Sequence, residues 1–477
     1  MTVSYRLPEF VEANKKYQLI RDVIAGSNAV KEKGEIYLPF TNFYADISTQ
    51  QSKKDYNNYL KRATFFNFTA RTLRSLLGQV FVNEPGIVVQ PALQFAIDDA
   101  TGGGVSLVQL AKLVTSTVIA YGRAGLFVNL PETVGNLSAD QILNNYRPSI
   151  ELFQPWQVIN WRTKIIRGKK LLTLVVVERD YVVEDDGYNQ TTSKEWVVLQ
   201  LDQNNDYLFQ VFRKELSTPF VAYYPTNAAG QVYKEIPFFF IGSVNNECGI
   251  DEAPLYEIAD INVAHYVNSA DYEQSCFVCG QPTLIIIGAS TQKGDDLAKT
   301  YALGANSAIN LPIGGDAKML QPEHNLEPAV AMRHKEEKMI ELGARLVERG
   351  GAQRTATEIT ITSLTENSAL SMIAQNVSNG LTNSLQMLAT FIGEATDQII
   401  IMLNTDYSLL TSTAADVKEA VAAKVAGAIT FSELRAVLRR AKMATLDDLE
   451  AKAIIDLEML ADLAAFELGR EPQVAQA

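Results

Sequence analysis

The sequence predicts an α+β protein that is mainly helical and carries its strands in the middle of the chain. Fifteen of its sixteen prolines lie at or before Pro328, and none occurs between Pro328 and Pro472. Because proline breaks the interior of a helix, the last third of the chain is free to be helical. Between residues 148 and 244, β-branched and aromatic runs alternate with Gly, Asn and Asp, which is typical of strands joined by turns.

Helices are expected before this β region, and an antiparallel sheet within it. Residues 55–82 are expected to form one helix, stopped by Pro85-Gly86, and Ser106–Tyr121 a second, followed by a short buried strand at Leu126–Asn129. The sheet should pack against the flanking helices and be built from the runs IELFQPWQVINWR, LLTLVVVERDYVV, EWVVLQLD, YLFQVFRK and IPFFFIGSV.

A helix is expected again at residues 251–275, where Pro254 suits the first turn. One face of this helix should carry Leu255, Ile258, Ala259, Asn262, Tyr266 and Ser269. A β-rich insertion that begins with PTLIIIG follows it and leads to a second helix at residues 327–349.

The longest periodic run of the chain follows the sequence GGAQRTATE and ends at Leu403. Spacings of three and four place its apolar and small side chains on one face for about six turns, which predicts a single long helix. The members of this stripe are Leu370, Ile373, Ala374, Val377, Leu381, Ser384, Leu385, Leu388, Phe391 and Ile392. Beyond Asn404-Thr405-Asp406, Thr430-x-x-Glu433 and Thr445-x-x-Asp448 are N-cap signals for two further helices.

Length and composition limit the possible classes of protein. A chain of 477 residues and 52.6 kDa is expected to form two to four domains. Its net charge of −13 argues against electrostatic wrapping of nucleic acid. Three cysteines, the absence of a signal pattern and the absence of an apolar run of about 20 residues favour reduced thiols, synthesis in the cytoplasm and no membrane association.

Patterns that carry chemistry are weak in this sequence. Cys276-x-x-Cys279 with His265 could contribute to a zinc site, but structural zinc normally takes four ligands, so ordinary thiols are the preferred interpretation. Residues 102–104 are three glycines without GxxxxGK[ST], which indicates a flexible loop and no ATPase. The GxSxG and HExxH patterns are also absent, so we expect neither an enzyme nor a metal or cofactor.

Charges balance around the second helix and the glycine-rich segment after it. The basic residues are Arg333, Lys335, Lys338, Arg345, Arg349 and Arg354, and they match six glutamates, Glu327, Glu336, Glu337, Glu341, Glu348 and Glu358. One interpretation is a solvated helix stabilised by ion pairs four residues apart. The other gives Arg354, together with Gln353, a role at the tip of a loop, where symmetry would repeat one charge around a ring.

Several stretches in colinear order, over about residues 40–395, resemble a tailed-bacteriophage portal protein, or head-tail connector. The resemblance is to a portal-like family long described as of unknown function. It is carried by YNNYLKRATFFNFTARTLRSLLGQVF, IAYGRAGLFVN, LYEIADINVAHYVNSADYE, GQPTLIIIG, EEKMIELGARLVER, TATE and ENSALSMIAQNVSNGLTNSLQMLATFIGEA.

The resemblance implies a mainly helical portal fold with a wing, a two-helix stem, a β-rich clip inserted between the stem helices, a tunnel loop and a helical crown. The implied divisions are wing 1–250, first stem helix 251–275, clip 276–325, second stem helix 326–349, tunnel loop 350–358, long wing helix 359–403 and crown 404–477. In the tunnel loop it places Gly350, Gly351, Gln353, Arg354 and Thr355 near DNA. The candidates for lining the channel in the stem are Arg333, Lys335, Lys338, Arg345 and Arg349.

The resemblance also implies partners and a location. The chain would form a homo-oligomer, usually of twelve subunits, at the portal vertex of the capsid in the virion. It would contact the major capsid protein, the terminase large subunit and then adaptor or tail proteins, and double-stranded DNA would pass through it without sequence specificity. Two alternatives stay open: another ring-forming connector or adaptor component, and, from a different class, a large soluble enzyme with an undetected site.

Overall fold

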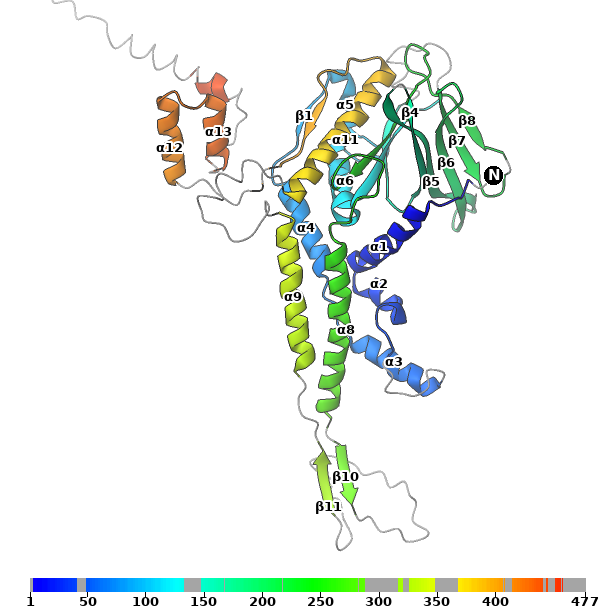
Figure 1. Cartoon of the computed structure of the whole chain (residues 1–477), viewed down its shortest axis with the longest axis vertical. Helices are drawn as coiled ribbons and strands as arrows, with labels where there is room; N and C mark the ends of the chain where they lie inside the picture. Colours follow the sequence, from blue (N-terminus) through cyan, green and yellow to red (C-terminus); the bar gives the residue numbers. More distant parts are fainter. Residues whose placement is uncertain are drawn as a thin grey trace, which may run out of the picture. The chain divides into compact units, whose positions relative to one another are not determined.

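The computed structural model (Figure 1) divides into two compact units, Met1–Thr405 and Asp406–Ala477. It describes residues 3–40, 49–132, 147–166, 168–216, 218–281, 283–287, 316–320, 326–347, 368–405, 407, 414–440, 443–444, 451–455 and 457. The expected tunnel loop at 350–358, most of the expected clip and the first part of the expected long helix lie outside these residues.

Helices dominate both ends of the first unit, and most strands lie between them. The helices are α1 (Pro8–Ala25), α2 (Ser27–Glu32), α3 (Gln50–Arg62), α4 (Phe68–Val80), α5 (Gln94–Asp98), α6 (Leu107–Tyr121), α8 (Tyr256–Cys279), α9 (Glu327–Arg345) and α11 (Ala369–Ile392), with 3-10 helices η1 (Gly34–Ile36) and η2 (Pro91–Leu93). Helices and sheets together confirm the predicted α+β class.

The strands of the middle region form two antiparallel sheets where the sequence predicted one. The first sheet has the order β3-β2-β9, and the second has the order β4-β5-β6-β7-β8. Their bounds are β2 (Arg123–Asn129), β3 (Ser149–Phe153), β4 (Val158–Ile166), β5 (Lys169–Asp185), β6 (Gln190–Leu201), β7 (Tyr207–Arg213), β8 (Val221–Tyr223) and β9 (Phe238–Gly242). The run IELFQPWQVINWR is divided between the sheets because the chain turns at Pro155, which has no N–H for a strand ladder.

The single helix predicted over residues 55–82 is wrong, since the structure has two helices there, α3 and α4. The backbone of Ala63 is non-helical, with φ −52° and ψ 133°. Asn67 then caps α4, because its side chain accepts a hydrogen bond from the N–H of Ala70 at 2.9 Å and donates one to the carbonyl of Ile24 at 3.1 Å. No Gly or Pro marks this break in the sequence.

The predicted apolar stripe lies on α11, and every one of its members is buried. This helix packs against α6, β2 and β9 (Figure 1). The predicted continuation to Leu403 is wrong, because α11 ends at Ile392 and Gly393 takes a left-handed conformation with φ 82°. The chain then returns as β12 (Ile400–Met402), which pairs with β1 (Gly86–Val88).

A buried arginine joins the two sheets. Arg123 on β2 is 4% exposed, and its guanidinium lies between the rings of Trp161 on β4 and Phe240 on β9, at 4.0 and 3.9 Å from their centres. It also donates a hydrogen bond of 2.8 Å to the carbonyl of Cys248. Burial lowers the pKa of Arg123 to about 10, which leaves it protonated at neutral pH.

The second unit contains α12 (Ala414–Val425) and α13 (Phe431–Arg440). The predicted N-cap of α13 is confirmed: the N–H of Thr430 donates to Glu433 at 2.6 Å, and the N–H of Glu433 donates to the Thr430 hydroxyl at 3.3 Å. The signal at Thr445 lies outside the described residues. In the part of the chain that the structure describes, no helix is both long and apolar enough to cross a membrane.

Candidate functional site

Helices α8 and α9, predicted as a pair that flanks a β-rich insertion, lie side by side and antiparallel (Figure 1). Contacts between His265 and Glu336, and between Asn268 and Lys335, run in opposite directions along the two helices. Helix α8 begins later than predicted, because Leu255 is its N-cap and Pro254 therefore precedes the helix instead of lying in its first turn. All six residues predicted on one face of this segment are buried.

The contact between the two helices centres on a buried histidine. His265 is fully buried, and the rings of Phe66 and Phe68 meet its imidazole edge to face, with 5.7 and 5.8 Å between the ring centres. Its Nε2 shares a hydrogen bond of 3.1 Å with Glu336 of α9. The sequence left a zinc ligand open for His265, but no group of three potential ligands that could hold a metal occurs among the described residues.

Hydrogen bonds also fix α8 to the helices that precede it in the chain. Asn262 accepts hydrogen bonds from the N–H and hydroxyl of Thr69 at 3.2 and 3.1 Å, and it donates to the carbonyl of Phe66 at 2.7 Å. Further along α8, the Tyr59 hydroxyl of α3 donates a hydrogen bond to Asp271 at 2.6 Å. Burial, followed by Asp271, raises the pKa of Tyr59, so this hydroxyl stays protonated.

A two-stranded hairpin framework is inserted in the sequence between α8 and α9. Strand β10 (Thr283–Ile287) begins four residues after α8 ends, and it pairs antiparallel with β11 (Asp316–Leu320). The run PTLIIIG was predicted as a strand, and β10 confirms it. The other predicted run of this insertion, SAINLPIGG, lies outside the described residues.

The charged candidates on α9 differ in their surroundings. Arg333, Lys338 and Arg345 are exposed, whereas Lys335 is half-buried and donates to Asn268 at 2.5 Å. Lys338 and Arg345 both pair with Glu341, and these cations lower the pKa of its carboxyl, Lys338 making the largest contribution. Among the described residues Arg333 has no such partner, and Lys335 contacts only a neutral amide, so neither charge is neutralised by a neighbouring carboxylate.

The candidates of the predicted tunnel loop, Gly350, Gly351, Gln353, Arg354 and Thr355, lie outside the described residues, as does Arg349. The chain on either side of them is nevertheless held together. The carbonyl of Leu346 accepts a hydrogen bond of 3.1 Å from the N–H of Leu370, which joins the end of α9 to the start of α11. The end of α9 and the start of α11 therefore lie next to each other.

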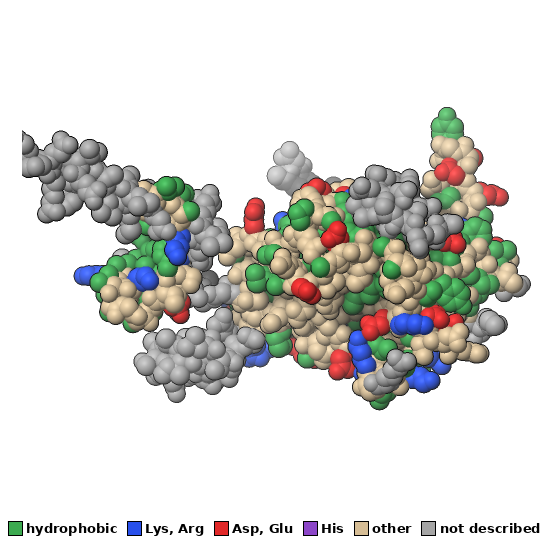
Figure 2. Space-filling model, turned by 90° about the horizontal axis from the view of Figure 1, so that it is seen from above, with side chains coloured by type: hydrophobic (Ala, Val, Ile, Leu, Met, Phe, Trp, Pro, Cys, Tyr) green, Lys and Arg blue, Asp and Glu red, His purple; other side chains and the backbone are tan. Residues whose placement is uncertain are grey.

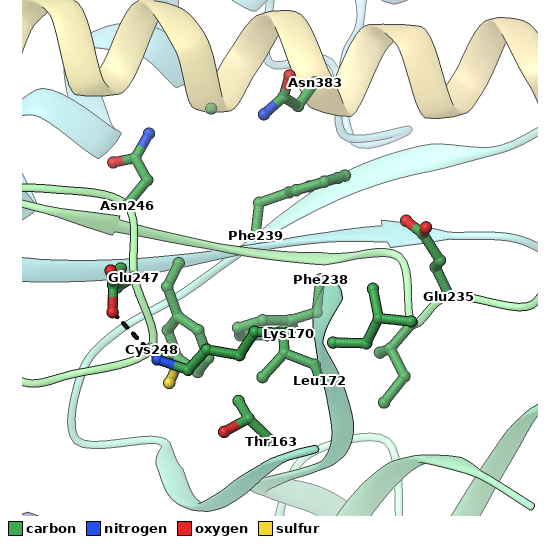
Figure 3. A pocket seen from close by; sticks show the side chains of 14 residues that line it. Thr163, Lys170, Leu172, Glu235, Phe238, Phe239, Asn246, Glu247, Cys248 and Asn383 are labelled. Atoms are coloured by element: carbon green, nitrogen blue, oxygen red, sulfur yellow. Dashed lines mark hydrogen bonds and ion pairs between the residues drawn. The ribbon is translucent and has the colours of Figure 1, made fainter. Parts of the chain in front are cut away.

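A cavity of about 380 Å³ lies between α11, β9 and the start of β5 (Figure 3). Figure 3 shows Asn383 of α11 above Phe239, and Lys170 paired with Glu247 at 3.1 Å. The hydrogen bond from Lys170 to Glu247 raises the pKa of the lysine, so its ammonium group stays protonated and is no base or nucleophile. The walls are otherwise mostly apolar, and this geometry favours a packing gap over a reaction site.

A family model matches the α8–α11 region of this chain, and two chains of solved structures align with most of its length. Two chains of solved structures, from the neck of a native GTA particle computed with C12 symmetry and of an empty GTA particle computed with C6 symmetry, align at 15% and 14% identity. Each alignment covers 80% of this chain and 92% of the other, with a TM-score of 0.39, which is too low to support an argument about fold or function. No curated protein matches. The family model described as "Domain of unknown function (DUF4055)" matches residues 254–392, the stretch that holds both paired helices, the insertion between them and α11.

Proposed function

We propose that this chain is the portal subunit of a tailed bacteriophage. Twelve copies would form a ring at one vertex of the capsid, and double-stranded DNA would pass through that ring into the head and out again. The chain would have no enzymatic activity of its own. Its partners would be the major capsid protein, the terminase large subunit that supplies ATP hydrolysis, and later the adaptor or tail proteins.

The observation that carries this proposal is the antiparallel pair α8 and α9 with a β-hairpin framework inserted between them. A helix of 24 residues such as α8 is about 36 Å long, enough to form one segment of a channel wall. Polar contacts fix α8 to α3 and α4, so that the pair can act as a rigid stem. The resemblance noted in the sequence assigns the same segments to stem and clip.

Exposed apolar side chains on this pair favour self-association. Ile340 is 64% exposed and Val330 44% exposed on α9, and Val278 is 44% exposed on α8. Large apolar side chains that are exposed on a single copy can be covered by a partner. Neighbouring copies in a ring would cover them, because each copy presents the same pair of helices.

The charges suit a passage through which DNA slides. The net charge of −13 and the equal numbers of acidic and basic residues around α9 disfavour tight binding to phosphates. We propose that Arg333 of the stem and Arg354 of the tunnel loop supply isolated positive charges along the passage. Lys338 and Arg345 remain candidates for the channel wall, but Glu341 neutralises them in part.

Electron microscopy and mass measurement of the purified full chain test this proposal. We expect rings with a central hole and a mass near twelve times 52.6 kDa. Ile340→Asp should reduce the yield of rings while leaving the thermal unfolding midpoint of the single chain nearly unchanged, because the side chain is already exposed there. A chain that stays monomeric at every concentration and salt tested would contradict the proposal.

A further inference from the structure

The second sheet carries opposite charges at the two ends of its longest strand, β5. At one end, residues 162–170, where β4 ends and β5 begins, include Arg162, Lys164, Arg167, Lys169 and Lys170 and no acidic residue. At the other end, the hairpin formed by β5 and β6 contains Glu184, Asp185 and Asp186 at its tip. We call residues 162–170 the basic turn and residues 180–194 the acidic arm.

The acidic arm extends beyond the rest of its sheet. Strand β4 pairs with β5 only over Lys169–Val177, and β7 pairs with β6 only over Glu195–Leu201. The ladder between β5 and β6 continues past both neighbours to the pair Asp185 and Gln190. An isolated two-stranded ribbon is marginally stable in water, so an arm of this kind gains stability from a partner that covers it.

The tip of the arm is ordered and exposes apolar surface next to its charges. Asp185 accepts a hydrogen bond from the N–H of Gly187, and Asp186 accepts from those of Tyr188 and Asn189. These backbone hydrogen bonds lower the pKa of both carboxyls and keep them ionised. Tyr188 is fully exposed, and Val182 and Val183 are almost half exposed.

The basic turn presents the complementary surface. Arg162 and Lys164 are exposed and have no side-chain hydrogen bond or ion pair with another described residue. Lys169 and Lys170 form ion pairs with Glu235 and Glu247, and these pairs are too exposed to hold the lysines strongly. Ile165, between them, is 72% exposed and could meet an apolar side chain of a partner.

We propose that the acidic arm of one copy docks on the basic turn of the next copy. Glu184 and Lys169 are fifteen residues apart on one strand, so about 50 Å separates the two surfaces within a chain. They cannot meet within one molecule, and a contact between them joins different parts of two copies, which is the head-to-tail arrangement that closes into a ring. Figure 2 shows acidic side chains on a projecting arm at one edge of the molecule and Lys and Arg side chains toward the opposite edge.

This inference rests on the proposed ring for its geometry, and cross-linking tests it separately. A zero-length carbodiimide reagent should be applied to an assembled 1:1 mixture of ¹⁴N- and ¹⁵N-labelled full chain. We expect peptides of mixed label that join Lys164, Lys169 or Lys170 to Glu184, Asp185 or Asp186. The pairs Lys169–Glu235 and Lys170–Glu247, at 2.7 and 3.1 Å within one chain, should give peptides of a single label and serve as the internal control.

A charge exchange provides the second test. Glu184→Lys and Lys164→Glu should each raise the concentration at half-assembly by about fivefold or more, and the double variant should recover most of that loss, because opposite charges then face each other again. Glu84→Lys, at another exposed glutamate without a bonded partner among the described residues, should have little effect.

The outcomes separate this inference from the proposed function. Rings that form without mixed-label cross-links and without rescue by the double variant would overturn the docking of the arm and leave the portal proposal intact. Mixed-label cross-links in open chains that never close would support the docking and contradict the portal proposal. If Lys164→Glu weakens binding to a 30-base-pair duplex and the cross-links are absent, the basic turn serves nucleic acid and the inference is wrong.

Discussion

His265 on α8 and Glu336 on α9 share a hydrogen bond of 3.1 Å, although the two residues are 71 positions apart in the sequence. The imidazole is fully buried and the glutamate side chain is 40% exposed. Because a carboxylate can only accept, Nε2 donates this hydrogen bond, and Nδ1 is a buried nitrogen without a hydrogen-bond partner among the described residues. The solvent-exposed part of this contact is therefore the glutamate of α9.

Removing the acceptor should destabilise the helix pair. In Glu336→Ala the buried Nε2–H of His265 loses its partner, which costs about 1–3 kcal/mol of unfolding free energy. Glu336→Gln retains a carbonyl oxygen and should lose less. Glu337→Ala, one residue further along on the exposed side of α9, is the matched control. Denaturant unfolding of the three variants measures the difference, and equal stability of Glu336→Ala and Glu337→Ala would refute the structural role.

Position 380 should not tolerate a side chain, although it lies in the middle of α11, where alanine is normally more stable than glycine. A Cβ there would approach Cδ1 of Ile241 on β9 to 2.5 Å, so Gly380→Ala should cost about 1–3 kcal/mol through overpacking. Gly78→Ala on α4 is the control, because its Cβ would meet no atom within 4 Å, and it should stabilise the chain by about 0.5–1 kcal/mol. Opposite shifts of the unfolding midpoint are expected, and a stabilising Gly380→Ala would contradict the close packing of α11 on β9.

Periodicity predicted the helices of this chain better than it predicted their ends. The stripe of α11 and the buried face of α8 follow from residue spacing, because burial on one side of a helix leaves a repeat of three and four. The break between α3 and α4 depends on the amide of Asn67 reaching Ile24, a distant contact that no local pattern reveals. The run after Gly393 is apolar enough to continue a helix, but its residues pair with β1 instead.

The candidate site was predictable in its order and not in its contacts. The sequence of helix, strand insertion and helix could be read directly, and the resemblance assigned it to stem and clip. The pairing of His265 with Glu336 could not be predicted, because the register of two antiparallel helices depends on side-chain packing along their whole length. Lys335 was a candidate for the channel wall on charge alone, and only the structure places it against Asn268.

Deleting residues 350–357 should separate the function of the predicted tunnel loop from assembly. The hydrogen bond from Leu370 to Leu346 lies outside the deletion, so the junction of α9 and α11 can persist. Rings should still form, while packaging or retention of DNA falls, as measured by the nuclease-resistant DNA in particles. Arg354→Ala should reproduce part of the loss. A deletion that abolishes the rings would assign the loop to assembly instead.

The stability of the protein should depend strongly on which residue replaces Arg123. The planar guanidinium fits between the rings of Trp161 and Phe240, an arrangement that a compact, strongly hydrated lysine ammonium cannot reproduce. Methionine fills a similar volume and loses the cation–π contacts and the hydrogen bond to Cys248, but it introduces no buried charge. We therefore expect Arg123→Lys to lower the unfolding midpoint more than Arg123→Met.

The pH dependence of the lysine variant gives an independent test of the burial at this position. Burial disfavours the ammonium, so the pKa of the introduced lysine should be lower in the folded state than its ordinary value of about 10.4. The unfolded chain then binds more protons, and the stability of Arg123→Lys relative to Arg123→Met should rise as the pH increases toward that value. Thermal unfolding at a series of alkaline pH values measures it. A constant difference between the two variants would show that the lysine escapes to solvent and that the space between the two rings is not closed.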